Sequence, residues 1–222
     1  MKRKEILIKA EKKAKKLFHS IRQENLIRPG ISEIQLGDEI YSLALRMFGI
    51  KKYWHKRIVR TGINTIYPYN ENPKNLIIKE DDILFLDFGP IFDNWEADIG
   101  RTYVLGDDPH KLKLLNDVED CWKISKNYYK NKQNITASDI FNYVNKLAME
   151  RSWNFGNEHC GHLIGEFPHE KVEGGRIKSY LHPENHLPLK NDKGNKLFWI
   201  LEIHFVDYEK KIGGFYEQLL SN

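Results

Sequence analysis

Apolar residues return at helical spacing at the start of the chain. Within residues 1–28 they occur every three or four positions, a pattern that predicts a helix with one buried face. The turn formers Arg28-Pro29-Gly30 follow, so we expect this helix to end near them. Its apolar positions are Ile6, Ala10, Ala14, Leu17, Phe18 and Ile21.

Three further helices are predicted where capping residues precede an apolar periodicity. A polar side chain at such a position accepts a hydrogen bond from the first free backbone N–H groups of a helix. The starts are marked by Ser32 with Gln35, by Asp107-Asp108-Pro109, and by Thr136 with Asp139. The first of these helices should run to Gly49, because glycine commonly ends helices.

Strands are predicted where apolar runs are shorter or alternate with polar residues. The strand-like segments are residues 53–60, a hairpin over 82–105, and the runs 197–206 and 212–220. Residues 62–73 should form a loop, and the polar segment 173–195 a loop or a lid. The sequence shows no internal repeat and nothing that resembles a flexible linker, so we predict a single α+β domain over residues 1–222.

Composition and charge narrow the possible partners and locations. The chain is 41% apolar and 30% charged, as globular proteins are. Residues 1–28 hold ten Lys/Arg against three Glu, which would suit nucleic acid or anionic membrane. The helical spacing instead places these lysines on a solvated face, so we predict neither a nucleic-acid nor a membrane partner.

The location is predicted from what the sequence does not contain. No segment approaches the roughly 20 apolar residues that cross a bilayer, and the basic start lacks the apolar core of a signal peptide. Cys121 and Cys160 do not form a disulfide framework or a CxxC pair, and we expect both to be reduced. We therefore expect a cytoplasmic protein.

The hairpin carries the first candidate chemistry, two aspartates on apolar strands. If its turn is centred on Phe92-Asp93, Asp87 and Asp98 lie directly opposite one another, with Cβ atoms about 4.5–5.5 Å apart. Two carboxylates held this close repel, and one or two divalent cations would resolve the conflict. The alternative is that one carboxylate faces solvent or pairs with Arg101.

Histidines and glutamates add further candidate ligands. Three of the nine histidines, His159, His162 and His169, fall within eleven residues, among glycines that allow close approach of backbone to a ligand. Their spacing is not that of a helical zinc-protease motif, so we expect one metal ligand and further site histidines on an irregular strand. Glu202 and Glu217 each lie inside an apolar run, where glutamate is rarely buried unless it is paired.

Four carboxylates with one imidazole suit two divalent cations. Hard oxygen ligands with one nitrogen favour manganese, iron, cobalt or a catalytic zinc pair over a closed structural zinc site. Such a pair activates a bridging water and polarises a carbonyl or phosphoryl oxygen. The ligand set therefore predicts a two-metal hydrolase.

At these residues the sequence resembles the pita-bread metallopeptidases, which include methionine aminopeptidase, aminopeptidase P and prolidase, with creatinase as a relative. The resemblance runs from Pro29-Gly-Ile-Ser-Glu33 to Glu217. It implies a curved antiparallel sheet flanked by helices, two divalent ions with manganese first and cobalt, iron or zinc as alternatives, a peptide substrate and a homodimer. The motif members are Asp87 in FLDFG, Asp98 in ADIGRT, His162 in GHLIG, Glu202 and Glu217.

The resemblance also implies a role for each ligand. Asp98 and Glu217 would bridge the two ions, Asp87 would hold one of them, and His162 with Glu202 the other.

Beyond the ligands, it makes Glu202 the proton shuttle. His169, seven residues after His162 and followed by an acid, matches the histidine that binds the scissile carbonyl. We also expect His159 and Tyr69 to contact the substrate.

The branch of the family is predicted from Gly62-Ile-Asn-Thr-Ile-Tyr-Pro-Tyr69. This segment resembles the Gly-x-Asn…Pro-His segment of aminopeptidase P and prolidase more than the His-Gly-Ile-Pro of methionine aminopeptidase. We therefore expect an exopeptidase that releases the N-terminal residue of Xaa-Pro peptides. Three residues depart from the family pattern: Tyr69 stands for a histidine, Gly100 for a threonine and Ile203 for a proline.

Other functions on the same fold remain as alternatives. They are a methionine aminopeptidase-like specificity, a non-catalytic binding protein and a metal-free hydrolase of the creatinase type. The last two typically lose ligands, whereas this chain has all five, which favours a metal-dependent enzyme.

Overall fold

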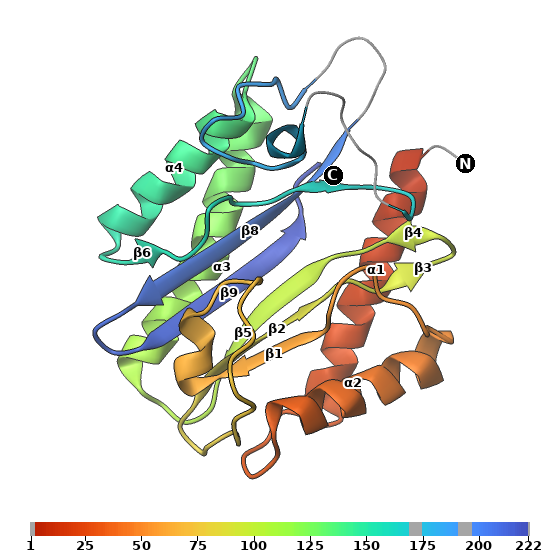
Figure 1. Cartoon of the computed structure of the whole chain (residues 1–222), viewed down its shortest axis with the longest axis vertical. Helices are drawn as coiled ribbons and strands as arrows, with labels where there is room; N and C mark the ends of the chain where they lie inside the picture. Colours follow the sequence, from red (N-terminus) through yellow and green to blue (C-terminus); the bar gives the residue numbers. More distant parts are fainter. Residues whose placement is uncertain (1–2, 169–174, 191–196, 222) are drawn as a thin grey trace.

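The computed structural model in Figure 1 describes residues 3–168, 175–190 and 197–221. It contains long helices and a curved antiparallel sheet, so the predicted α+β class is confirmed. The helical elements are α1 (Arg3–Gln23), α2 (Glu33–Phe48), α3 (Pro109–Asn131) and α4 (Ala137–Glu150), with short 3-10 turns at η1 (Gly62–Ile66) and η2 (Arg176–Ser179).

The main sheet has the strand order β1-β2-β5-β9-β8-β6, and β7 pairs with β8 beside this path. A second, two-stranded sheet is formed by β3 and β4 at the tip of the predicted hairpin. The strands are β1 (Ile58–Thr61), β2 (Ile83–Phe88), β3 (Ile91–Phe92), β4 (Trp95–Glu96), β5 (Ile99–Val104), β6 (Asn154–Phe155), β7 (Leu163–Ile164), β8 (Phe198–Asp207) and β9 (Ile212–Leu219).

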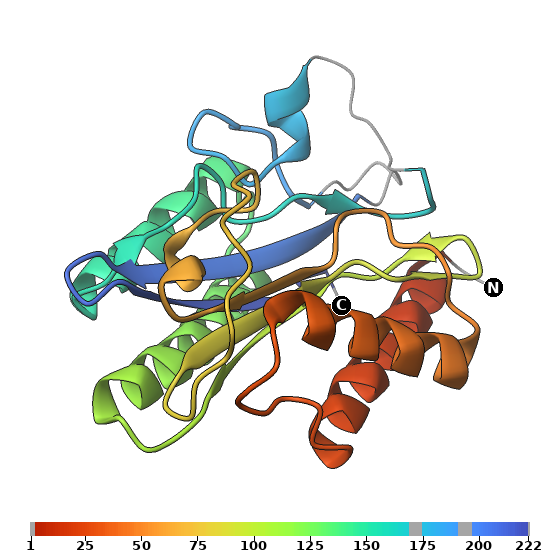
Figure 2. The same cartoon turned by 60° about the horizontal axis from the view of Figure 1, so that its bottom comes forward.

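Helices cover one face of the sheet and leave the other face to connecting segments. Figure 2 shows α1, α2 and α3 on one side, and residues 156–168 and 175–190 on the opposite side. On β2, Leu84, Leu86 and Phe88 join the core beneath the helices, while Phe85 and Asp87 line a cavity on the other face. This alternation follows from the two-residue period of a strand.

The predicted helix starts agree with the structure. Ser32, Asp108 and Thr136 are the N-caps of α2, α3 and α4, and α2 ends at Gly49 in the left-handed conformation. Only half of the capping box predicted at Ser32 forms. The backbone N–H of Gln35 donates to Ser32, but its side chain donates to Glu39 instead.

Two predicted boundaries are wrong. Helix α1 ends at Gln23, several residues before the turn at Arg28. The strand predicted over residues 53–60 begins only at Ile58, because the backbone at Trp54 bonds to Gly89 outside the ladder. None of the described helices is long and apolar enough to cross a membrane.

Candidate metal centre

A row of directly paired residues crosses four strands at the centre of the sheet. Asp87 on β2 pairs with Gly100 on β5, Gly100 pairs with Glu217 on β9, and Glu217 pairs with Glu202 on β8. Side chains of directly opposed residues point to the same face, and their Cβ atoms are about 4.5–5.5 Å apart. The sheet register thus brings three carboxylates from distant parts of the chain to one cavity wall; we call Asp87, Gly100, Glu217 and Glu202 the acidic row.

The register predicted for the hairpin is wrong by two residues. Asp98 does not lie opposite Asp87; it occupies the break between β4 and β5. The turn is at Asp93-Asn94, where both residues have positive φ (50° and 65°), one residue later than predicted. Asn and Asp tolerate this conformation and form the two-residue hairpin turn.

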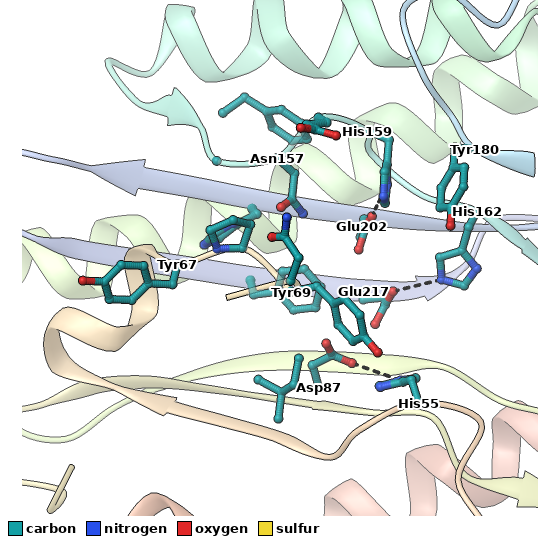
Figure 3. Close-up of a pocket in the computed structure, with 18 of the residues that line it drawn as sticks. His55, Tyr67, Tyr69, Asp87, Asn157, His159, His162, Tyr180, Glu202 and Glu217 are labelled. Carbon is teal, nitrogen blue, oxygen red and sulfur yellow. Dashed lines mark ion pairs between the residues drawn. The ribbon is translucent and has the colours of Figure 1, made fainter. Parts of the chain in front are cut away.

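Histidines nevertheless connect Asp98 to the acidic row on both sides. The Nε2 atom of His162 lies 3.1 Å from Asp98 Oδ2 and 3.6 Å from Glu217 Oε1. The Nε2 atom of His55 lies 3.2 Å from Asp98 Oδ1 and 3.5 Å from Asp87 Oδ1. Figure 3 shows both rings directed at the carboxylates. Asp98 is therefore shared by two groups of donor atoms, each compact enough for one metal ion.

Burial makes the carboxylates of this centre costly to ionise together. Burial, together with the neighbouring Asp98 and Glu202, raises the pKa of Asp87 to about 7. Burial also raises the pKa of Glu217 well above its ordinary value, as do Asp98 and Asp87. Asp98 is different: burial opposes its ionisation, but His55 and His162 lower its pKa to about 2.

For the two histidines, burial lowers the pKa and the neighbouring carboxylates raise it. Burial lowers the pKa of His55, but Asp87 and Asp98 outweigh burial and raise it to about 9. His162 is likewise opposed by burial, and its hydrogen bond to Asp98 raises its pKa well above the ordinary value. Both rings respond to a strongly negative environment, which is the environment that a divalent cation requires.

Buried oxygen atoms without partners test whether a metal fits. Among the described residues, Asp87 Oδ1 and Glu217 Oε2 are buried and accept no hydrogen bond. An unpaired buried carboxylate oxygen carries the full cost of its lost hydration, so such atoms call for an external partner. A divalent cation bound to the acidic row, Asp98 and His162 meets this need.

Glu202 has a different neighbour. The Nδ1 atom of His159 lies 2.7 Å from Glu202 Oε1, although the two atoms are not aligned for a hydrogen bond. The ring of His159 also lies against Tyr180, with centroids 4.4 Å apart. The sequence predicted His159 and Glu202 in one site, and the structure brings them together. His169 lies outside the described residues.

All these groups face one cavity of about 1090 Å³ on the open face of the sheet. Its wall combines the acidic row with rings from the segments above it, as Figure 3 shows for Tyr67, Tyr69, His159 and Tyr180. Tyr69 lies at the rim, with 47% of its surface exposed, and its ring contacts the ring of His55 and the ammonium group of Lys56. Burial raises the pKa of Tyr69, so its hydroxyl remains a donor.

His55 is the residue of this centre that sequence analysis missed. It lies in residues 53–60, where a strand was predicted, and it belongs to none of the motifs of the resemblance. A signal was present in the adjacent Trp54, an aromatic residue beside a histidine in an otherwise basic segment. That signal is weak without the contact to Asp98.

Arg101 does not neutralise either aspartate. Its guanidinium donates to the carbonyls of Gly100 and Glu217 and to the side chain of Gln218. The alternative in which Arg101 pairs with one of the two aspartates is thus wrong. Cys160, close to His162 in sequence, is fully buried and its thiol pKa is raised by burial.

Gly100 shows how one departure from the family pattern is accommodated. A Cβ atom at this position would lie 2.3 Å from the ring of Phe215 and 3.0 Å from Cβ of Glu217. The Phe215 ring therefore fills the space above Gly100, in the middle of the acidic row. A threonine here would require Phe215 to move.

Glu33, from the first motif of the family resemblance, is hydrogen-bonded to the segment that begins at Gly62. The buried carboxylate of Glu33 accepts hydrogen bonds from the backbone N–H groups of Thr61 and Leu76 and from the side chain of Asn64. Asn64 also donates to the carbonyl of Lys74. These residues hold both ends of the 62–76 loop, and this loop presents Tyr67 and Tyr69 to the cavity.

Comparisons with known proteins agree with this geometry. The sequence profile of metallopeptidase family M24 matches residues 5–195. Methionine aminopeptidase 1 of Saccharomyces cerevisiae is 25% identical over 150 residues, covering 64% of this chain and 38% of that protein. A putative Xaa-Pro aminopeptidase of Mycoplasma genitalium is 31% identical over 97 residues, covering 44% of this chain and 27% of that protein. The chain thus spans well under half the length of these relatives.

Solved structures confirm the predicted pita-bread fold. X-Pro aminopeptidase from Thermotoga maritima superposes with a TM-score of 0.80 at 18% identity, covering 99% of this chain and 61% of that one. Methionine aminopeptidase from the same organism gives a TM-score of 0.73 at 15% identity, covering 96% and 94% of the two chains. Since the family profile covers most of the sequence, this chain belongs to metallopeptidase family M24.

Proposed function

We propose that this chain is a metal-dependent exopeptidase that releases the N-terminal residue of Xaa-Pro peptides. The observation that carries the proposal is the convergence of four carboxylates and His162 on one cavity, with Asp98 shared by two groups of donor atoms. Non-catalytic relatives on this fold typically lose ligands, whereas all five are present here.

The proposed cofactor is a pair of divalent cations. Asp87 and Asp98 would hold one ion and His162 and Glu202 the other, with Asp98 and Glu217 contacting both. Manganese is our first candidate because most donors are oxygen atoms, and cobalt, iron or zinc are alternatives. When bound, such a pair lowers the pKa of a water molecule and polarises the scissile carbonyl.

Side chains beside the ligands would manage the protons. We propose that Glu202 accepts a proton from the attacking water and passes it to the leaving amine, as a general base and then a general acid. His159, whose Nδ1 atom lies 2.7 Å from Glu202 Oε1, would position that carboxylate. We propose that His169 binds the scissile carbonyl, as the family resemblance implies.

Substrate preference rests on the loop that ends at Tyr69. The Gly62–Tyr69 segment resembles the proline-directed enzymes, and two Mycoplasma relatives at 30–31% identity carry the description putative Xaa-Pro aminopeptidase. Tyr69 at the cavity rim would donate a hydrogen bond to the peptide. A homodimer and a cytoplasmic location remain predictions from the sequence.

Hydrolysis of a peptide panel tests the proposal. The chain would be loaded with Mn²⁺, Co²⁺, Fe²⁺ or Zn²⁺, and the products from Xaa-Pro and Met-Xaa peptides identified by mass spectrometry. We expect release of the residue before proline. We also expect Asp98→Ala to reduce turnover by about 10³-fold or more, because both donor groups lose a member. The exposed Asp107→Ala is the matched control and should retain full activity.

Each other outcome identifies a different function. Release of methionine without proline dependence would indicate a methionine aminopeptidase-like enzyme, which the yeast relative makes the second candidate. Absence of hydrolysis by protein shown to contain two ions per chain would indicate a binding protein. Unchanged turnover in Asp98→Ala would refute the metal centre as the site of catalysis.

A further inference from the structure

His55 has the environment of a metal ligand, although no motif of the chain includes it. Its side chain is only 4% exposed, and its Nε2 atom faces Asp98 Oδ1 at 3.2 Å and Asp87 Oδ1 at 3.5 Å. Ligand atoms that share one cation at bond lengths of about 2.1 Å are about 3.0–3.5 Å from one another. Both distances from His55 match this spacing, and the three residues offer ligand atoms that all lie within 4.8 Å of one another.

A hydrogen bond at Nδ1 orients the His55 ring so that Nε2 faces the carboxylates. Nδ1 of His55 lies 2.6 Å from the carbonyl oxygen of Lys56, and a carbonyl can only accept, so Nδ1 carries the hydrogen. His162 is arranged in the same way, with Nδ1 2.7 Å from the carbonyl oxygen of Leu163. A hydrogen bond from the outer nitrogen to a carbonyl is the usual support of a metal-binding histidine.

The surrounding packing holds His55 in this place. Gly89 follows β2 directly, and a Cβ atom there would lie 2.3 Å from His55 Cδ2 and 2.3 Å from Trp54 Nε1. Trp54 in turn donates from Nε1 to the carbonyl of Ala97 and from its backbone N–H to the carbonyl of Gly89. The segment that carries His55 is therefore tied to the backbone next to both Asp87 and Asp98.

Asp87 supplies the remaining observation. Its Oδ1 atom is buried and accepts no hydrogen bond among the described residues, although His55 Nε2 is its near neighbour. His55 Nε2 is already hydrogen-bonded to Asp98, so the Asp87 oxygen is the atom that lacks a partner and is available to a ligand. A cation among His55, Asp87 and Asp98 would satisfy this oxygen and replace the contact of His55 with Asp98.

We propose that His55 is a sixth protein ligand, a nitrogen donor to the cation held by Asp87 and Asp98. The proposal rests on the metal centre of the proposed function and adds a ligand to it. Each ion then has one imidazole, His55 at one and His162 at the other. Because imidazole favours cobalt over manganese more than carboxylate does, His55 shifts the preference of its ion toward cobalt.

Metal titration of the metal-free chain tests the ligand directly. We expect the unsubstituted chain to bind two Mn²⁺ or two Co²⁺ per chain in calorimetry. His55→Ala should bind one of the two at least about tenfold more weakly, with a larger loss for Co²⁺ than for Mn²⁺. His55→Phe keeps a ring against Trp54, so it separates the loss of the ligand from a loss of packing, and it should show the same weakening. His182→Ala, a histidine of the same cavity whose ring contacts Phe141 and which belongs to neither group of donor atoms, is the matched control and should bind as the unsubstituted chain does.

Pulsed electron paramagnetic resonance adds a readout that packing alone would not change. The Mn²⁺-loaded chain should show imidazole nitrogen couplings that weaken in His55→Phe and persist in His182→Ala. Unchanged affinity and couplings in both His55 variants would overturn the proposal while leaving the metal centre intact. Tighter metal binding in these variants would overturn it too, because His55 would then compete with the ion. If the unsubstituted chain binds none of the metals, the proposed function fails together with the ligand.

Discussion

Two rows of residues cross the same sheet two positions apart along each strand, and they satisfy their polar groups differently. The acidic row has buried oxygen atoms at Asp87 and Glu217 without hydrogen-bond partners among the described residues. The neighbouring row, which we call the closed row, has internal partners for the polar groups of its side chains. It consists of Arg60, Phe85, Thr102, Phe215 and His204.

The closed row is completed by the protein itself. The Arg60 guanidinium donates to the carbonyls of Tyr67, Pro68 and Glu71. The ring of His204 donates to the carbonyl of Thr65, and burial lowers its pKa to about 4, so the ring is neutral. Both rows are buried, so burial does not distinguish them. The rows differ in whether their buried polar groups have hydrogen-bond partners within the protein. A row without such partners is where a ligand would bind.

Metal removal should reveal this difference with the largest effect. A ligand that binds only the folded chain stabilises it by about 2.7 kcal/mol at 100 times its dissociation constant. We expect chelation to lower the free energy of unfolding of the Mn²⁺-loaded chain by about this amount, measured in urea with and without EDTA. Asp98→Ala should be insensitive to EDTA. Equal sensitivity of that variant would show that the ions bind outside the acidic row.

Thr102→Val tests the closed row. The Thr102 hydroxyl accepts a 2.6 Å hydrogen bond from the backbone N–H of Phe215 and donates a 2.8 Å bond to its carbonyl. Valine has nearly the same shape but leaves both buried backbone groups unpaired, at a cost of about 1–3 kcal/mol. We expect this loss of stability in urea unfolding, with two bound ions retained by metal analysis. Loss of an ion would mean that the two rows are not separate in function.

Much of the fold was predictable because it depends on local signals. The N-caps Ser32, Asp108 and Thr136 act on their own helix, and the left-handed glycine at Gly49 ends α2 within the same segment. The strand runs were found from their apolar periodicity. The hairpin register was not, because it depends on which two residues occupy the turn, and Asp93-Asn94 lies one residue beyond the predicted centre.

The residues of the candidate site likewise divide into those that a local pattern reveals and those that only the folded chain reveals. Asp87, Glu202 and Glu217 were recognised because a carboxylate in an apolar strand is unusual in itself. Their alignment through Gly100 is a property of the sheet order β2-β5-β9-β8, which no local pattern contains. His55 was missed for the same physical reason, since its meaning depends on a contact with Asp98 across 43 positions of sequence.

The smallest expected change in stability is that of Asp87→Asn in the metal-free chain, and it tests the difference between the acidic row and the closed row. Asparagine keeps the shape of the side chain and removes one of the crowded buried charges. We expect the metal-free variant to be more stable than the metal-free unsubstituted chain by about 1 kcal/mol, and to bind metal more weakly. A residue of the closed row should show no such gain when its polar group is removed.

The pH dependence of this gain has a definite sign. The pKa of Asp87 is raised in the folded chain to about 7 from an ordinary value of 3.8, so the folded state retains a proton that the unfolded state releases between these values. The stability of the metal-free unsubstituted chain therefore falls as the pH rises from about 4 to 7, and the asparagine variant lacks this term. Urea unfolding at pH 5 and pH 8 should thus show a larger gain at pH 8. An equal gain at both values would mean that Asp87 is ionised throughout and that His55 alone compensates its charge.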